Sequence, residues 1–253
     1  MLQSPHPLND LAKQFAEIGA NIQAAFQPIA KMAAQAFDSF RPAMLAIAEA
    51  IQKLPDDLRI VVSALAERGW YISAEMDRPF LRLLQAAVES GDLSVIDNLM
   101  ESWVESSISE IEARAAARFP NRAAIIAAAI QAHQRQEFEL SVPVLLIQVE
   151  GMCVQEFETK LYSTKKGVPT TKDFAESMID GPITEVFLLP LCQPSGLTAG
   201  ADYRSNYPYA INRHEILHGI NTDYASLTNS LKAISLMDYF VSLVIKKESP
   251  AES

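Results

Sequence analysis

The sequence predicts an all-α protein, and three observations carry that prediction. Apolar residues recur at intervals of three and four through most of the chain, the spacing that gathers them on one face of a helix. Only 9 glycines and 14 prolines occur in 253 residues, and many of them stand where a periodic segment stops. Hydrophobic residues make up 49% of the chain, which is enough to bury a sizeable core and excludes a wholly disordered protein.

The first 120 residues are expected to be helical throughout. An apolar stripe over residues 15–36 predicts a first helix, which Pro28 kinks or splits. The sequence Phe-Pro-Asn at 119–121 marks a break after a long amphipathic segment. We therefore divide the chain into an N-terminal region, residues 1–120, expected to serve as a regulatory, partner-binding or dimerising surface, and a C-terminal domain, residues 121–253. Further N-terminal helices are expected at residues 41–54, 56–68, 78–90 and 93–118.

The C-terminal domain is predicted to be helical as well. The run VPVLLIQV is rich in β-branched residues, but its apolar pattern continues in steps of three and four to Leu161, which favours a helix from Ser141 over a strand. A polar loop is expected at 163–172, and a longer one at 193–210, a length at which loops are usually functional or disordered. Helices are expected at residues 122–139, 141–162, 173–180, 183–189, 212–219 and 223–246.

Charge, cysteine content and the length of apolar runs exclude several classes of protein. With 21 basic and 31 acidic residues, the chain is not a basic nucleic-acid platform. Cys153 and Cys192 are too few for a disulfide framework and indicate reduced thiols, so we expect a cytoplasmic location. The amino terminus lacks the pattern of a signal peptide. The longest apolar run, residues 123–130, spans only about 12 Å as a helix, so no membrane segment is expected.

One stretch, NRHEILHG at residues 212–219, concentrates residues that carry chemistry, including two of the four histidines. His214, Glu215 and His218 match the zinc motif His-Glu-x-x-His, in which two imidazoles one helical turn apart share a tetrahedral metal. Glu215 would act as the base on the zinc-bound water. No histidine follows His218, so the candidate third ligand is Asp238. We find no β-sheet of the kind that usually frames such sites.

The same stretch also fits metal-free cleavage of RNA. That reaction needs a group of near-neutral pKa to move protons, for which histidine is suited, and a cation that holds phosphate, for which arginine is suited. His218 and Arg213 supply both. Five residues turn a helix by about 140°, so the two side chains share a face only if the helix begins or ends between them, or if two copies face each other.

Residues 122 to about 247 resemble the HEPN superfamily, whose toxin and defence members include metal-independent endoribonucleases. The family motif, an arginine, a polar residue, three residues and a histidine, is matched at Arg213, His214 and His218, within a similar order of long helices, loop, motif and final helix. Some members carry a tyrosine two residues after the histidine, where this chain has Ile220, so regulation through that tyrosine is not expected.

The resemblance implies a toxin or phage-defence endoribonuclease that works without a cofactor, with RNA as substrate and with paired motifs in the cleft of a homodimer. Arg213 would hold the scissile phosphate, His218 would transfer the proton, and His214 would support their orientation. Because the net charge is −10, a local cationic cleft is required for RNA. The candidate substrate-binding residues are Asn212, Arg204, Lys165 and Lys166.

Several residues leave alternatives open. Glu150 either pairs with Arg213 and orients it or faces solvent at a helix end. His133 is expected to be an exposed helix histidine, and Trp70 to pack in the core. Two other functions also fit the chain: a catalytically silent helical interaction module, and a zinc-dependent hydrolase that uses His214, His218 and Asp238 with Glu215 as base.

Overall fold

A computed structural model describes residues 56–199 and 205–248 of the chain. By compactness the chain divides into two units, Met1–Lys53 and Leu54–Ser253, and all the described residues belong to the second. The helices predicted at residues 15–36 and 41–54 therefore lie outside the described residues, as does Arg204.

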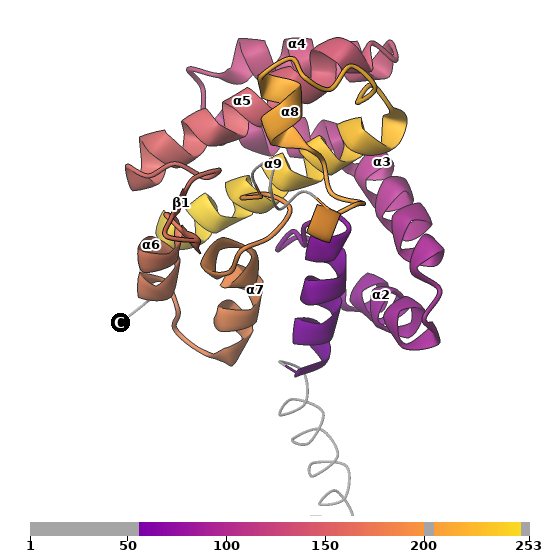
Figure 1. The fold of residues 1–253 in the computed structure, drawn as a ribbon, viewed down its shortest axis with the longest axis vertical. Coiled ribbons are helices and arrows are strands. Elements are labelled where there is room, and N and C mark those ends of the chain that lie inside the picture. The colour runs from indigo at the N-terminus through magenta and orange to yellow at the C-terminus, as the bar shows by residue number, and fades with distance from the viewer. Residues whose placement is uncertain (1–55, 200–204, 249–253) are drawn as a thin grey trace, which may run out of the picture. The chain divides into compact units, whose positions relative to one another are not determined.

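The described part of the chain is mostly helical, which confirms the all-α prediction (Figure 1). A first helix occupies residues 56–67, and two very short strands form the only sheet among the described residues. The remaining elements are α2 (Arg78–Ser90), α3 (Leu93–Arg118), α4 (Ala123–Gln134), α5 (Phe138–Phe157), β1 (Thr164–Lys165), β2 (Val168–Pro169), α6 (Lys172–Ser177), α7 (Pro182–Cys192), α8 (Arg213–Leu217) and α9 (Leu227–Glu248).

Helix α9 is the central element of this unit and lies between α3 and α5 (Figure 1). Its side chains from residue 230 to residue 244 are all buried, the polar ones included. A buried polar group is costly unless it is hydrogen-bonded, and each of these finds a partner on another element. The partners are His133 and Ser141 for Ser230, the Tyr209 carbonyl for Lys232, the Tyr71 amide for Ser235, Arg114 for Asp238, and Ser73 for Ser242.

The hydrophobic core runs across the division predicted between residues 120 and 121. Helix α3 packs against both α4 and α9. Phe119 and Ile126, on either side of that division, are fully buried in the same core. Trp70 is fully buried as expected and donates its indole N–H to Asp97 on α3 over 2.8 Å.

Helix α5 begins earlier than the sequence predicted, at Phe138 rather than at Ser141. Pro143 therefore lies inside the helix, where its missing N–H leaves the carbonyl of Glu139 without its usual helical donor. The hydroxyl of Tyr224 donates to this carbonyl over 3.0 Å. The carbonyl of Glu139, left free by the proline, thus connects the segment between α8 and α9 to α5.

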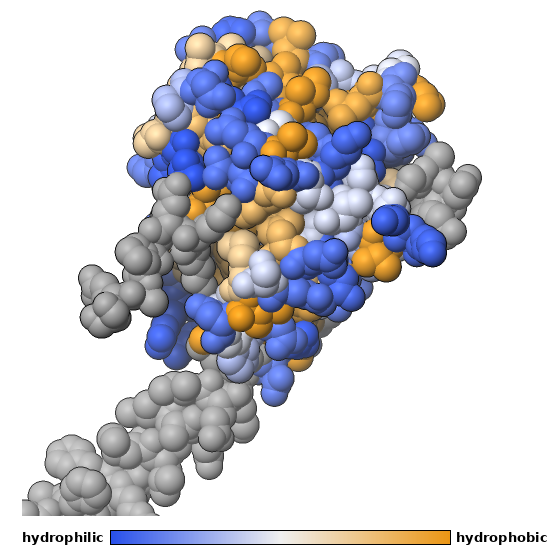
Figure 2. Space-filling view, turned by 90° about the vertical axis from the view of Figure 1, so that its left-hand side faces the viewer, coloured by the Kyte–Doolittle hydropathy of each residue, from blue (hydrophilic) through white to orange (hydrophobic). Residues whose placement is uncertain are grey.

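Helix α5 is the one helix among the described residues that is long and apolar enough to cross a membrane by length and composition. It packs against α4 and α9, and eight of its residues are buried. The core helix of a bundle passes the same test of length and composition. Figure 2 shows one face of the molecule, on which apolar residues reach the surface in small groups separated by hydrophilic ones.

The polar loop predicted at 163–172 is instead a small antiparallel hairpin, in which Thr164 pairs with Pro169 and Lys165 with Val168. Lys166 and Gly167 both have positive φ, 54° and 80°, which is the conformation of a two-residue type I′ turn. A glycine at the second turn position makes this turn accessible, so the lysine-rich segment folds back on itself.

His133 was expected to be exposed, and that prediction is wrong, because the side chain is buried in the core. Only 3% of the residue is accessible, and its Nδ1 lies 2.8 Å from the hydroxyl of Ser230. Ser230 in turn contacts the hydroxyl of Ser141 over 2.9 Å. The opposite ring nitrogen, Nε2, lies 3.6 Å from the carboxylate of Glu105. One polar chain thus joins α3, α4, α5 and α9.

We expect the stability of the protein to fall in mild acid because of His133. Burial lowers the pKa of His133 below its ordinary value of 6.5, and the nearby Glu105 carboxylate offsets only part of this effect. The unfolded chain therefore binds this proton more readily than the folded chain. The stabilisation is complete above about pH 6.5 and is lost as the pH falls from there through the lowered folded pKa.

Urea unfolding measured between pH 7.5 and pH 5 tests this expectation. The free energy of unfolding should decline toward low pH in the wild type and less steeply in His133→Gln. His218→Ala serves as the control, because that histidine is exposed. An unchanged slope in His133→Gln would show that this residue is not the source of the pH dependence.

Candidate functional site

The motif predicted from the sequence forms α8, a helix of 5 residues with defined ends. Asn212 caps it, because its side-chain oxygen accepts from the amide of Glu215 over 3.2 Å. The helix ends at His218, whose amide donates to the carbonyl of His214 over 3.1 Å, and Gly219 follows in the left-handed conformation. Asn212 is thus the N-cap and Gly219 follows the C-terminal end, and the helix is shorter than the eight-residue motif.

The structure brings the two motif histidines together. The imidazole rings of His214 and His218 have centroids 4.5 Å apart and an interplanar angle of 61°. His218 is exposed and His214 is partly exposed. Neither imidazole makes a hydrogen bond or an ion pair with any residue that the structure describes. Both rings are therefore available to a ligand or a substrate.

Arg213 is directed inward and acts as the anchor of α8. Its Nε donates to the carbonyl of Leu197 over 3.1 Å, and its Nη2 donates to the carbonyl of Tyr162 over 2.6 Å. The guanidinium carbon also lies 5.0 Å from the centre of the Tyr162 ring. Burial lowers the pKa of Arg213, while Tyr162 and Glu150 act in the opposite direction. The guanidinium thus ties α8 to two distant segments of the chain.

These contacts limit the phosphate-binding role predicted for Arg213. Two of its three guanidinium nitrogens are engaged by carbonyl groups, which leaves Nη1 without a hydrogen-bond partner among the described residues. Arg213 and His218 share no hydrogen bond and no cation–π contact in the described structure, which agrees with the rotation of about 140° between helix positions five apart.

Glu150 makes no hydrogen bond with Arg213 in the described structure and is linked to it by hydrogen bonds through the backbone of Tyr162. Its Oε2 accepts from the amide of Tyr162 over 3.2 Å, while Arg213 donates to the carbonyl of the same residue. The Tyr162 hydroxyl completes the arrangement by donating to the carbonyl of Leu146 over 2.8 Å. Of the two alternatives for Glu150, the structure therefore favours an orienting role, but an indirect one in which the carboxylate holds the backbone that Arg213 grips.

The predicted cationic residues lie close to this anchor along the chain. Lys165 and Lys166 are exposed on the β1–β2 hairpin, which begins two residues after Tyr162. Three residues span at most about 11 Å, so the Cα atom of Lys165 lies within that distance of Tyr162. The bond from Arg213 to Tyr162 thus keeps the base of the lysine hairpin near α8.

The structure does not assemble the zinc site that the His-Glu-x-x-His pattern offers. The expected third ligand, Asp238, is buried in α9, and its Oδ1 accepts from Arg114 over 2.6 Å. In residues 56–199 and 205–248, no three side chains of His, Cys, Asp or Glu lie close enough together to hold a metal ion. A catalytic zinc usually has three protein ligands, so the donor set of a zinc hydrolase is incomplete.

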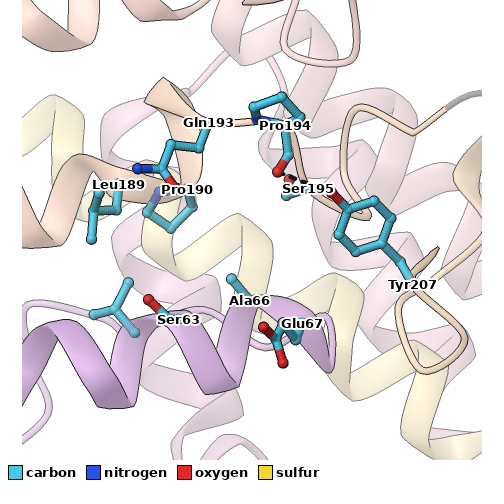
Figure 3. A pocket seen from close by; sticks show the side chains of 10 residues that line it. Ser63, Ala66, Glu67, Leu189, Pro190, Gln193, Pro194, Ser195 and Tyr207 are labelled. Carbon is cyan, nitrogen blue, oxygen red and sulfur yellow. Dashed lines mark hydrogen bonds between the residues drawn. The ribbon is translucent and has the colours of Figure 1, made fainter. Parts of the chain in front are cut away.

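Sequence reasoning missed a pocket of 240 Å³ between the helix at residues 56–67 and the end of α7 (Figure 3). Ser63 and Glu67 lie on one side of it, and Gln193 on the other. Tyr207 closes the rim, where its hydroxyl donates to the carbonyl of Pro194 over 3.2 Å. Its walls come from segments more than a hundred residues apart, so no local pattern marks the pocket. Part of the long loop predicted at 193–210 lines it.

Comparisons of this chain with models of known protein families, with curated proteins and with solved structures find no match. What indicates the function is therefore the chemistry of the site. Its distinguishing feature is a pair of adjacent, accessible imidazoles on a short helix that an inward-facing arginine holds in place.

Proposed function

We propose that this protein is a metal-independent endoribonuclease of the HEPN type, with α8 as its catalytic element. One observation carries the proposal: α8 presents the imidazoles of His214 and His218 side by side at the surface, with no hydrogen-bond partner among the described residues. The helical fold and the match of the Arg213 motif to that family support it.

Two accessible imidazoles supply what RNA cleavage requires. A neutral imidazole removes the proton from the 2′-hydroxyl, whose oxygen then attacks phosphorus, and an imidazolium gives a proton to the departing 5′-oxygen. The products are a 2′,3′-cyclic phosphate and a 5′-hydroxyl, so atoms and charge balance without a metal or an oxidant. In this proposal His218, the more exposed ring, is the principal proton carrier, and His214 beside it is the second imidazole and supports its orientation.

Arg213 and the lysines would hold the phosphate backbone. The engaged nitrogens of Arg213 keep α8 in position, and the remaining Nη1 would be its contribution to the phosphate. Lys165 and Lys166 are exposed on the neighbouring hairpin and would extend this cationic surface. Because the chain has a net charge of −10, binding of RNA would depend on this local cluster. A homodimer with paired motifs, and a toxin or phage-defence setting, belong to the same proposal.

A catalytically silent interaction module is the second candidate, and the contacts of Arg213 are the observation that favours it. An arginine whose Nε and Nη2 both bind backbone carbonyls serves the fold whether or not the site turns over RNA. The two candidates differ in the behaviour of His218. Its side chain contributes no hydrogen bond to the described structure, so its removal should leave the fold intact and should lower RNA cleavage only if the histidine is catalytic.

The test is cleavage of a mixed RNA pool by the wild type and by His218→Ala, His214→Ala and Ile220→Ala. General acid–base catalysis contributes on the order of a hundredfold or more, so His218→Ala should lose at least that much activity. Ile220 is 65% exposed and near the pair, so Ile220→Ala should retain activity and serves as the matched control. All variants should melt within a few degrees of the wild type. Undiminished cleavage by His218→Ala would remove the histidine from the mechanism.

A further inference from the structure

The histidine pair has the geometry of a two-ligand metal chelate. His214 and His218 stand four positions apart at the N-terminal and C-terminal ends of α8, so their side chains project from the same side of the helix. Their ring centroids are 4.5 Å apart. A transition metal bonds imidazole nitrogen at about 2.0–2.1 Å, which in a tetrahedral arrangement separates two ligand nitrogens by about 3.3 Å. With ring centroids 4.5 Å apart, rotation of the two side chains can bring one nitrogen of each ring to that separation.

The surroundings of the pair favour a metal ion over other ligands. Neutral imidazole is the commonest ligand for divalent zinc, copper and nickel. Each imidazole carries a nitrogen lone pair that no described residue occupies. The exposure of His218 leaves room for water to complete the coordination sphere. Because no third His, Cys, Asp or Glu joins the two in the described part of the chain, such a site would be open and of modest affinity.

We infer that His214 and His218 together bind one divalent first-row transition-metal ion, and that this ion inhibits the protein. The inhibition, unlike the metal binding, rests on the proposed function. A metal bonded to the imidazole nitrogens occupies the lone pairs that must take up a proton before it can be passed on during cleavage, so metal binding and proton transfer exclude each other. Zinc would thus act here as an inhibitor rather than as a catalyst. The affinity should be highest for Cu²⁺ and lower for Ni²⁺ and Zn²⁺. Co²⁺ should bind more weakly than Ni²⁺.

Calorimetric titration of the full chain, without a histidine tag, with zinc chloride tests the site directly. The wild type should bind one Zn²⁺ per chain, and both His214→Ala and His218→Ala should bind at least tenfold more weakly. His6→Ala is the matched control, because it removes a histidine outside the pair and should leave binding unchanged. Equal zinc binding by the wild type and both α8 variants would overturn the inference.

An activity assay separates this inference from the proposed function. If the wild type cleaves RNA, zinc at a concentration that saturates the calorimetric titration should suppress cleavage, and excess EDTA should restore it. Zinc that binds through both histidines and leaves cleavage at its full rate would overturn the inhibitory role. Zinc binding that requires both histidines, in a protein that cleaves no RNA, would uphold the metal site while the proposed ribonuclease fails.

Discussion

Arg114→Ala should lower the free energy of unfolding by about 3 kcal/mol, because it leaves a buried carboxylate without its countercharge. Asp238 is 1% exposed, and its Oδ1 accepts from the Arg114 guanidinium over 2.6 Å. The second oxygen, Oδ2, has no hydrogen-bond partner among the described residues. The Asp238 charge is thus balanced within the described structure by this one arginine, and the substitution removes it.

Urea denaturation measures this effect, and two further variants interpret it. Glu110→Ala, an exposed change one turn earlier on α3, should alter stability by less than about 0.5 kcal/mol. The double variant Arg114→Met with Asp238→Leu removes both charges and keeps the volume, so it should recover most of the loss. If Arg114→Ala unfolds with the free energy of the wild type, the ion pair does not stabilise the fold.

Arg213→Ala should cost about 2–3 kcal/mol of stability, in contrast to the neutral effect expected for His218→Ala. Bonds from a charged donor to a carbonyl contribute on the order of 1.5 kcal/mol each, and Arg213 makes two, to Leu197 and to Tyr162. Lysine cannot reproduce the fork of the guanidinium, so Arg213→Lys should recover only part of the loss. Urea denaturation of the three variants measures these differences.

The stability of Arg213→Ala determines how the activity of this variant is interpreted. Loss of cleavage in Arg213→Ala would combine displacement of α8 with the loss of a phosphate contact, so the result would not assign a catalytic role. If Arg213→Ala is as stable as the wild type and inactive, the arginine acts on the substrate and its carbonyl contacts are of little energetic weight. Equal stability together with full activity would contradict both roles.

The helical fold follows from local patterns that sequence reasoning can read. In the long amphipathic segment at residues 93–118, apolar residues that share one helical face are fully buried along α3: Ile96, Met100, Val104 and Ile111. The Asn212 cap is likewise a short-range signal, since capping depends on residues two or three positions away. These features lie within one or two helical turns, where periodicity and end signals are informative.

The position of His133 shows where such reasoning fails. Helix α4, AAIIAAAIQAHQ, is apolar on almost every side, so periodicity does not say which face is buried. The partner that accommodates His133 is Ser230, 97 residues further along the chain. No local pattern reports a contact of that range.

The inward orientation of Arg213 was missed for a similar reason. Its acceptors are the backbone carbonyls of Tyr162 and Leu197. Because every residue has a backbone carbonyl, the sequence does not indicate which carbonyls Arg213 binds. The motif identified the residue types and their spacing, and the tertiary fold decided which side chains face solvent.

The chemistry of the RNA ends produced in excess EDTA distinguishes a metal-independent ribonuclease from the other candidates. The wild type and His218→Ala should be incubated side by side with the same RNA pool, and the new termini identified. We expect the wild type to produce 2′,3′-cyclic phosphate and 5′-hydroxyl ends without metal. We expect His218→Ala to produce no such ends. Absence of cleavage by the wild type, or ends carrying 3′-hydroxyl and 5′-phosphate groups, would contradict these expectations.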